Sequence, residues 1–199
     1  MSTWEQHLAE AREALRRSIQ DAALRLIEGR GMPHTTMSAV AEAAGVSRQT
    51  LYNHYPDLES IMLDAARARI AQAAGMIESA MESAPDTRSA LSVYIRGMLE
   101  GSEASDYAGM TGMSREAEEQ VMEMLGPLQD LLEKLLREGI DDGSFRPELD
   151  PADVAEIVAD VAEIVFHMIG SGRRLIQIGR DASRVAQITE SLILRAVSA

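Results

Sequence analysis

The sequence contains no cysteine and few aromatic residues: two Phe, four Tyr and one Trp in 199 residues. Without cysteine, the chain can form neither disulfide bonds nor thiolate metal sites. There is also no run of eighteen apolar residues and no charged-then-apolar leader, so we expect a soluble cytoplasmic protein. Strand-like alternation of useful length is missing as well, which favours an all-α fold.

The common catalytic motifs are absent too. The sequence has no cysteine nucleophile, no phosphate-binding loop, no HExxH and no Gly-x-Ser-x-Gly. Its histidines show no metal-ligand spacing: His7, His34, His54 and His167. An acidic helical surface explains the many carboxylates without perturbed pKa values. We therefore expect no enzyme, no cofactor and no metal.

Acidic residues outnumber basic ones, and the excess lies in one part of the chain. The 32 acidic and 19 basic residues give a net charge of −13. Residues 1–56 hold six of each kind, so residues 57–199 carry the whole excess. The N-terminal segment is therefore the part that repels DNA least, while an acidic body discourages non-specific binding.

The segment from Thr35 to Tyr55 predicts two short helices joined by a tight turn. Thr35 or Thr36 can cap the first helix, because a threonine hydroxyl accepts from a free backbone amide. Apolar positions recur at spacings of three and four: Met37, Val40, Ala41 and Ala44. Gly45 can adopt the left-handed turn, and Ser47 can cap the second helix. This pattern indicates a helix-turn-helix, whose second helix lies in the major groove of DNA.

The second helix of this motif has one face suited to a duplex. With Leu51 as the buried point, at about 100° per residue, the polar side chains point outward. They are Arg48, Gln49, Thr50, Tyr52 and Asn53. Arg can bind guanine bidentately, Gln or Asn can bind adenine, and the Thr methyl can contact thymine. The alternative is an exposed polar helix on any small α-domain.

With these residues in view, the chain resembles the TetR family of bacterial transcriptional regulators. The family signature combines an amphipathic first helix, a Thr-Thr start, an Ala-Gly-Val-Ser turn and a Leu-Tyr-x-His-Phe/Tyr ending. Here the first helix is expected at residues 14–30, and residues 47–55 supply the ending almost position for position. The resemblance covers roughly residues 13–74.

The resemblance implies roles for single side chains. Arg48, Gln49 and Thr50 would read bases, Tyr52 and His54 would contact phosphates, and Thr36 would brace the backbone. The full set of DNA-binding candidates adds the cap and the outward face: Thr36, Ser47, Arg48, Gln49, Thr50, Tyr52, Asn53 and His54.

Two departures from the family pattern remove basic groups. Members often carry Lys where residues 57–59 read Asp-Leu-Glu, and many carry Arg at the position of Ser38. Each lost cation should weaken DNA binding and lower its salt dependence by about one counterion. One hypothesis is that three N-terminal arginines compensate: Arg12, Arg16 and Arg17.

The chain length fits two domains. Residues 1–56 are expected to bind DNA, and residues 57–199 to form a helical ligand-binding and dimerisation domain. A long helix from Asp57 to about Ser83 would join them, so a ligand could act by tilting it. Later helices are expected at residues 86–101, at residues 114–141 with a bend at Pro127, from Asp150 onward, and from about Asp181.

The last two expected helices carry apolar stripes. The resemblance implies that they pack against their twins in a four-helix interface, and a two-fold dimer fits a palindromic operator. The alternative is ordinary core amphipathicity. The interface candidates are Val154, Ile157, Val158, Val161, Ile164, Val165, Met168, Val185, Ile188 and Leu192.

The larger domains of the family usually enclose a pocket for a small molecule, so the resemblance implies a small apolar or amphipathic effector. The candidate lining residues are Tyr94, Met98, Tyr107, Met110, Met113, Met122, Phe166 and His167. Methionine suits an adaptable apolar cavity, although it equally fills an irregular core.

The sequence therefore predicts a dimeric TetR-like regulator that represses transcription and is released from double-stranded DNA by its effector. The alternative is a helical interaction protein that retains the motif but has lost DNA binding, a reading that the acidic residues 57–59 suggest.

Overall fold

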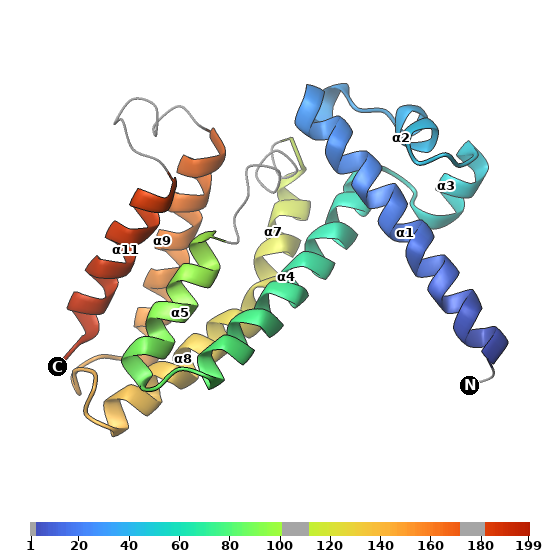
Figure 1. Ribbon diagram of the computed structural model, residues 1–199. Coiled ribbons are helices and arrows are strands. Elements are labelled where there is room, and N and C mark those ends of the chain that lie inside the picture. The colour runs from blue at the N-terminus through green and yellow to red at the C-terminus, as the bar shows by residue number, and fades with distance from the viewer. Residues whose placement is uncertain (1–2, 101–111, 172–181) are drawn as a thin grey trace. The chain divides into compact units, whose positions relative to one another are not determined.

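In the computed structural model, which describes the backbone of residues 3–100, 112–171 and 182–199, the regular elements are helices (Figure 1). They are α1 (Thr3–Arg30), η1 (Met32–His34), α2 (Met37–Ala43), α3 (Arg48–His54), α4 (Leu58–Glu82), α5 (Thr87–Glu100), α7 (Arg115–Met124), α8 (Gly126–Asp141), α9 (Pro151–Ser171) and α11 (Ala182–Val197). The predicted all-α fold is confirmed. None of the helices in these described ranges is long and apolar enough to cross a membrane.

Backbone contacts divide the chain into two compact units. The first unit comprises Met1–Ala68 and Ala108–Val121, and the second comprises Arg69–Tyr107 and Met122–Ala199. Helices α4 and α7 each contribute residues to both units.

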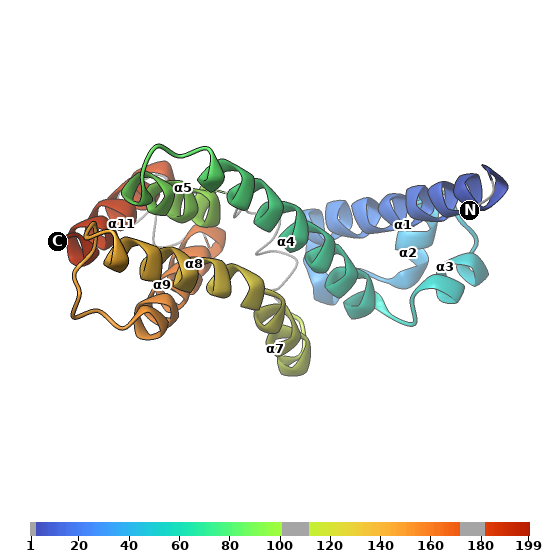
Figure 2. The same ribbon diagram turned by 90° about the horizontal axis from the view of Figure 1, so that it is seen from below.

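Two apolar clusters form the core of the first unit, in which α1 packs on α2 and α2 on α3 (Figure 2). The first cluster consists of Ile19, Ala22, Ala23, Val40, Ala41, Leu51, Tyr55 and Ile61. The second consists of Leu24, Ile27, Met32, Met62 and Ala65. Because four members are alanine, the helices can approach one another closely.

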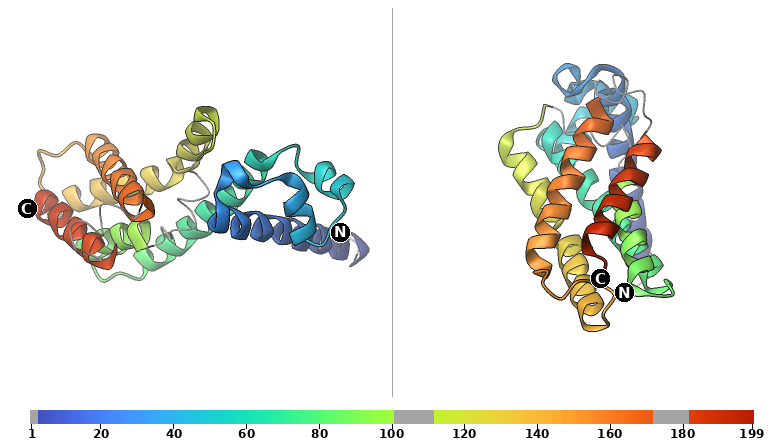
Figure 3. Two further views of the ribbon diagram at one scale, coloured as in Figure 1. Left: turned by 90° about the horizontal axis from the view of Figure 1, so that it is seen from above. Right: turned by 90° about the vertical axis from the view of Figure 1, so that its left-hand side faces the viewer.

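Helix α1 begins at Thr3, eleven residues before the expected start at Ala14. Its first turns extend past α2 and α3 (Figure 3), and residues 3–14 are exposed. Good helix formers stabilise this extension, whose sequence includes Glu, Gln, Leu, Ala and Arg. Because all of its residues are exposed, the burial pattern that revealed the rest of the helix is absent there.

The core of the second unit is built from α5, α8, α9, α11 and the second half of α4. Helix α11 packs along α5, and α8 packs along α9 (Figure 3). The buried residues are Ile77, Ala90, Leu91, Tyr94, Ile95, Leu99, Leu128, Leu132, Leu135, Leu136, Phe145, Ala155, Val158 and Val197.

Residues 114–141 form two helices, so the expected single helix with a bend is wrong. Helix α7 ends at Met124, and α8 begins at Gly126. Pro127 lies in the first turn of α8. A proline has no N–H to offer, and the first turn of a helix is where that N–H would have no intrahelical partner. Pro127 therefore starts a new helix instead of bending an existing one.

Gly139 lies against the aromatic ring of Phe145 in the second core. Phe145 is fully buried, and its backbone N–H donates to the Gly139 carbonyl at 2.8 Å. A Cβ atom built on Gly139 would overlap the ring. By contrast, a Cβ on the exposed Gly75 of α4 would meet no atom within 4 Å.

We predict that Gly139→Ala lowers the free energy of unfolding by about 1–3 kcal/mol, because an overpacked core forces its neighbours to shift. The matched control is Gly75→Ala, which should raise it by roughly 0.5–1 kcal/mol through helix propensity alone. Urea denaturation followed by circular dichroism measures both. Equal stability of the Gly139→Ala protein and the wild type would contradict the tight packing of Phe145.

Candidate nucleic-acid interface

Helix α2 begins at a threonine cap. Thr36 is extended, with φ −114° and ψ 148°, and its hydroxyl oxygen accepts from the Ala39 N–H at 3.3 Å. The neighbouring Thr35 is buried, and its hydroxyl donates to the Gly31 carbonyl at 3.0 Å. Of the two possible caps, the structure thus uses Thr36, while Thr35 holds the end of α1 to the segment that follows it.

The turn between α2 and α3 has the predicted left-handed glycine. Gly45 has φ +70°, a conformation that a β-carbon disfavours. The N–H of Val46 donates to the Ala41 carbonyl at 2.9 Å, and the N–H of Gly45 donates to the Glu42 carbonyl at 3.1 Å. These bonds satisfy carbonyls at the end of α2 and fix the exit direction of the chain.

Helix α3 is held by a cap at its start and by one apolar side chain in its middle. The Ser47 hydroxyl accepts from the Thr50 N–H at 3.0 Å. Leu51 is 0% exposed and packs among the residues of the first cluster. Together they determine which side of α3 faces the core and which side faces solvent.

The outward side of α3 carries the hydrogen-bonding residues, as the sequence predicted. Tyr52 is 52% exposed, whereas Thr50 is half-buried beside the cap. The other DNA-binding candidates are exposed: Thr36, Ser47, Arg48, Gln49, Asn53 and His54. Their orientation is confirmed, and their contacts with DNA stay a prediction.

Two amide side chains on this face are joined. The Gln49 Nε2 donates to Asn53 Oδ1 at 2.9 Å, one helical turn away. This bond does not use the carbonyl of Gln49 or the amide hydrogens of Asn53. An acceptor and a donor of this kind are complementary to the N6 and N7 edge of adenine.

The acidic residues that replace the family's lysine have structural roles. Asp57 Oδ1 accepts from the Ser60 N–H at 2.8 Å and caps α4. Glu59 accepts from the N–H of Ser114, and its other oxygen accepts from the Ser114 hydroxyl at 3.1 Å. Leu58 between them is half-buried and packs against both clusters of the first unit. A lysine at position 58 would lose this apolar packing.

Of the three arginines expected to compensate, Arg16 has a partner within the protein, and its contact with DNA stays a prediction. Its guanidinium is paired with the Asp64 carboxylate, with Nη2 2.5 Å from Oδ1 and Nε 3.2 Å from Oδ2. Arg17 lies 3.9 Å from Glu13 on the same helix, an exposed pair of small energetic value. Arg12 is exposed and stays a candidate.

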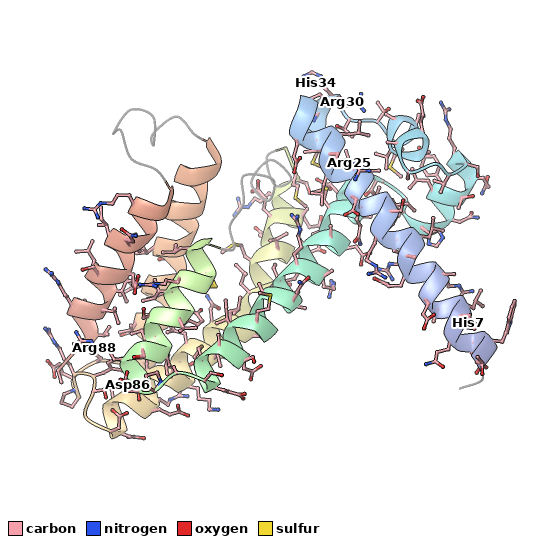
Figure 4. The ribbon with its side chains drawn as sticks, viewed as in Figure 1. His7, Arg25, Arg30, His34, Asp86 and Arg88 are labelled. Atoms are coloured by element: carbon pink, nitrogen blue, oxygen red, sulfur yellow. The ribbon has the colours of Figure 1, made fainter. Side chains whose placement is uncertain are left out.

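Three further basic side chains of the first unit escaped the sequence analysis. Figure 4 shows Arg25 and Arg30 on the last turns of α1 and His34 in η1, just before α2. All three are exposed. They lie outside the helix-turn-helix motif, and His34 precedes the first residue of α2, Met37, by three positions. His7 lies at the opposite end of α1 (Figure 4).

The predicted ligand-pocket residues do not form one group. Tyr94 is buried in the second core, where its hydroxyl donates to the Leu128 carbonyl at 3.1 Å, and Met98 packs beside it. Met113 instead packs in the second cluster of the first unit, and Met122 is exposed, which corrects their expected place in a pocket of the larger domain. The cluster that Met113 packs against includes Met32, and the flexible thioether of methionine adapts readily to such an apolar surface. The remaining candidates lie outside the described side chains: Tyr107, Met110, Phe166 and His167.

The predicted dimer residues differ in how far they are exposed. Ile157 and Leu192 are 60% and 64% exposed, and Ile188 is half-buried. Val158 is buried in the core of its own unit, which corrects its assignment to the interface. Two others also pack against that core: Val154 and Val161. Four side chains lie outside the described part of the chain: Ile164, Val165, Met168 and Val185.

A shallow cleft of about 330 Å³ lies between α5 and α11 in the second unit, and it contains none of the predicted pocket residues. At its base, buried Glu190 accepts from Ser92 and from the Nε of Arg96 at 2.8 Å. Burial raises the pKa of the Glu190 carboxyl, but these hydrogen bonds outweigh it, so the pKa lies below its ordinary value. Figure 4 shows Arg88, at the edge of the cleft, next to Asp86 at the start of α5.

Comparisons with known proteins agree with this geometry. Residues 19–65 match the family model for bacterial regulatory proteins of the tetR family. The chain is 26% identical over 164 residues to the HTH-type transcriptional repressor KstR2 of Rhodococcus jostii (strain RHA1), covering 79% of this chain and 80% of that protein.

Two solved structures share the fold. One is the fatty acid degradation regulator FadR from Bacillus halodurans, with TM-score 0.77, 22% identity, and 90% and 94% of the two chains covered. The other is the transcriptional regulator FadR from Bacillus subtilis in complex with stearoyl-CoA, with TM-score 0.75, 19% identity, and 89% and 97% covered.

We predict that Ser47→Ala lowers the free energy of unfolding by about 1 kcal/mol, because the first turn of α3 loses its acceptor. Ser47→Asp is the control, since its carboxylate can accept the same bond and should preserve the stability. Thermal melting followed at 222 nm measures both. An equal loss in the two variants would show that the hydroxyl is not acting as a cap.

Proposed function

We propose that this chain, which residues 19–65 assign to the TetR family of bacterial regulatory proteins, binds a palindromic operator as a homodimer and represses transcription. The observation that carries the proposal is the orientation of α3. Buried Leu51 fixes one side of the helix to the core, and the remaining surface of the helix presents Arg48, Gln49 and Tyr52 to solvent. In the major groove, Arg48 would read guanine, Gln49 with Asn53 would read adenine, and Tyr52 would contact phosphate.

The charge distribution supports a division of labour between two domains. We assign DNA binding to residues 1–56 and ligand binding and dimerisation to residues 57–199. The first segment is neutral and the second carries the acidic excess, so the phosphates of DNA are repelled least by the end that would contact them. The first turns of α4 pack in the first unit, which makes α4 the covalent link between the two domains.

Dimerisation would use α9 and α11. Large apolar side chains on a surface are candidates for burial in an interface, and Ile157 and Leu192 are each more than half exposed on these two helices. A two-fold dimer would present two copies of α3 to successive major grooves, about one helical turn or a multiple of it apart.

The effector would be a small apolar or amphipathic molecule. The fold is shared with a regulator crystallised with stearoyl-CoA, whose acyl chain is apolar and whose head group is polar. Such a ligand would favour a conformation of the larger domain in which the spacing of the two α3 helices no longer fits the operator. Release from DNA would follow from this shift in population.

The alternative is an interaction protein that has lost DNA binding. This alternative was suggested mainly by the two acidic residues just after the motif, Asp57 and Glu59. The hydrogen bonds of Asp57 to Ser60 and of Glu59 to Ser114 give these residues structural roles, and they leave the outward face of α3 intact. We therefore favour the regulator.

Replacing Gln49 and Tyr52 with alanine should abolish operator binding and leave the melting temperature within experimental error, because both side chains are exposed. Fluorescence anisotropy with DNA from the protein's own promoter region measures binding over a series of salt concentrations. Arg115→Ala, an exposed change at the start of α7, is the control and should bind normally. Failure of the wild type to bind any DNA at low salt would favour the interaction protein.

Introducing charge on the proposed dimer surface should produce monomers. Ile157→Glu combined with Leu192→Glu would place like charges opposite each other in a buried interface, which is unfavourable by several kcal/mol. Sedimentation velocity at micromolar concentration measures the mass. Met76→Glu changes another exposed apolar residue, on α4, and should leave the dimer intact. A dimer that survives the double change would rule out this surface.

A further inference from the structure

A polar cluster inside the first unit joins α1, α4 and the end of α3. Its centre is the Asp64 carboxylate on α4, which is paired with Arg16 of α1. Asp64 Oδ2 also accepts from the Tyr55 hydroxyl at 2.5 Å and from Gln20 Nε2 at 2.9 Å. Gln20 Nε2 lies 3.3 Å from the Tyr55 hydroxyl, which closes the cluster.

The carboxylate at the centre of this cluster is largely shielded from solvent, although the cluster lies close to the surface. The side chain of Asp64 is 21% exposed, that of Arg16 is 44% exposed, and Tyr55 is buried. Burial alone would raise the pKa of Asp64, but the hydrogen bonds from Arg16 and Tyr55 outweigh it and hold the pKa below its ordinary value. Burial and the Asp64 partner raise the pKa of Tyr55, so its hydroxyl remains a donor. The carboxylate therefore stays ionised and holds three donors from two other elements.

Tyr55 connects this cluster to the reading face. It is the C-cap residue of α3, and its ring packs with Leu51 in the first cluster. Its backbone N–H donates to the Leu51 carbonyl at 2.9 Å, so the end of α3 follows the position of the tyrosine. With Ser47 fixing the start and Leu51 the middle, the hydroxyl of Tyr55 is the third point that fixes how α3 is rotated about its axis.

We infer that Asp64 is a positioning residue for DNA recognition, and that Arg16 acts on DNA through Asp64 and not as a phosphate contact. This inference rests on the proposed DNA binding. Without the carboxylate, α3 would be less restrained in rotation, and only part of the population would present Gln49 and Tyr52 correctly. If about one tenth of the molecules remain competent, the apparent affinity falls about tenfold.

A double-mutant cycle tests the inference. The variants are Asp64→Asn, Arg16→Gln and the two combined, with dissociation constants for the operator measured at several salt concentrations. Each single change should weaken binding about tenfold. Because both act through one cluster, the double variant should be no weaker than either single one. The slope of log affinity against log salt should equal that of the wild type for all three.

The control is Arg67→Gln, which removes an exposed arginine of α4 that is not part of the cluster. It should not reproduce the tenfold loss. Tyr55→Phe keeps the ring in the core and removes only the hydroxyl, so it tests the connection in a protein that stays folded. It should weaken binding by a smaller factor in the same direction.

The results of these binding experiments distinguish an error in the inference from an error in the proposed function. A salt slope reduced by about one for Arg16→Gln, with Asp64→Asn binding normally, would identify Arg16 as a phosphate contact and overturn the inference. If circular dichroism shows all variants folded at the assay temperature and their affinities equal that of the wild type, the cluster is only structural and the inference is wrong. A wild type that binds no DNA overturns the proposed function itself.

Discussion

The surface proposed to read DNA depends on the burial of one leucine. Helix α3 has seven residues, and helices this short are not stable in water by themselves. Burying Leu51 completely contributes about 1.5–3 kcal/mol, which is the main reason that the segment is helical at all. The Ser47 cap adds a smaller share and sets the starting point. The exposure of Arg48, Gln49 and Tyr52, the residues proposed to contact DNA, therefore depends on the burial of Leu51.

The motif and its orientation could be predicted from the sequence because the relevant interactions are local. A cap, a left-handed glycine and an apolar spacing each concern residues within four positions of one another. The structure has the caps at Thr36 and Ser47, the left-handed glycine at Gly45 and the buried apolar residues Val40 and Ala41 in α2. The all-α class of the fold was also predictable, since it requires only helical periodicity and the absence of strand patterns.

The errors concern interactions between distant positions. Arg16 and Asp64 are 48 residues apart, and nothing in the local pattern of either shows that they pair. Met113 was expected to line an apolar pocket of the larger domain, yet it packs against the cluster of the first unit that includes Met32. Val158 lies in an apolar stripe wide enough to serve a core and an interface, so periodicity could not decide between them. The break before α8 was missed for a different reason: a proline can either bend a helix or begin one.

The exposed beginning of α1 also determines what the intrinsic fluorescence of this protein reports. Trp4 is the single tryptophan of the chain, and it is 74% exposed on turns of α1 that no core residue covers. Its indole is already in water when the protein is folded, so its emission would change little as either core comes apart. Intrinsic tryptophan fluorescence would instead follow fraying of the N-terminal turns, or the arrival of another molecule beside them.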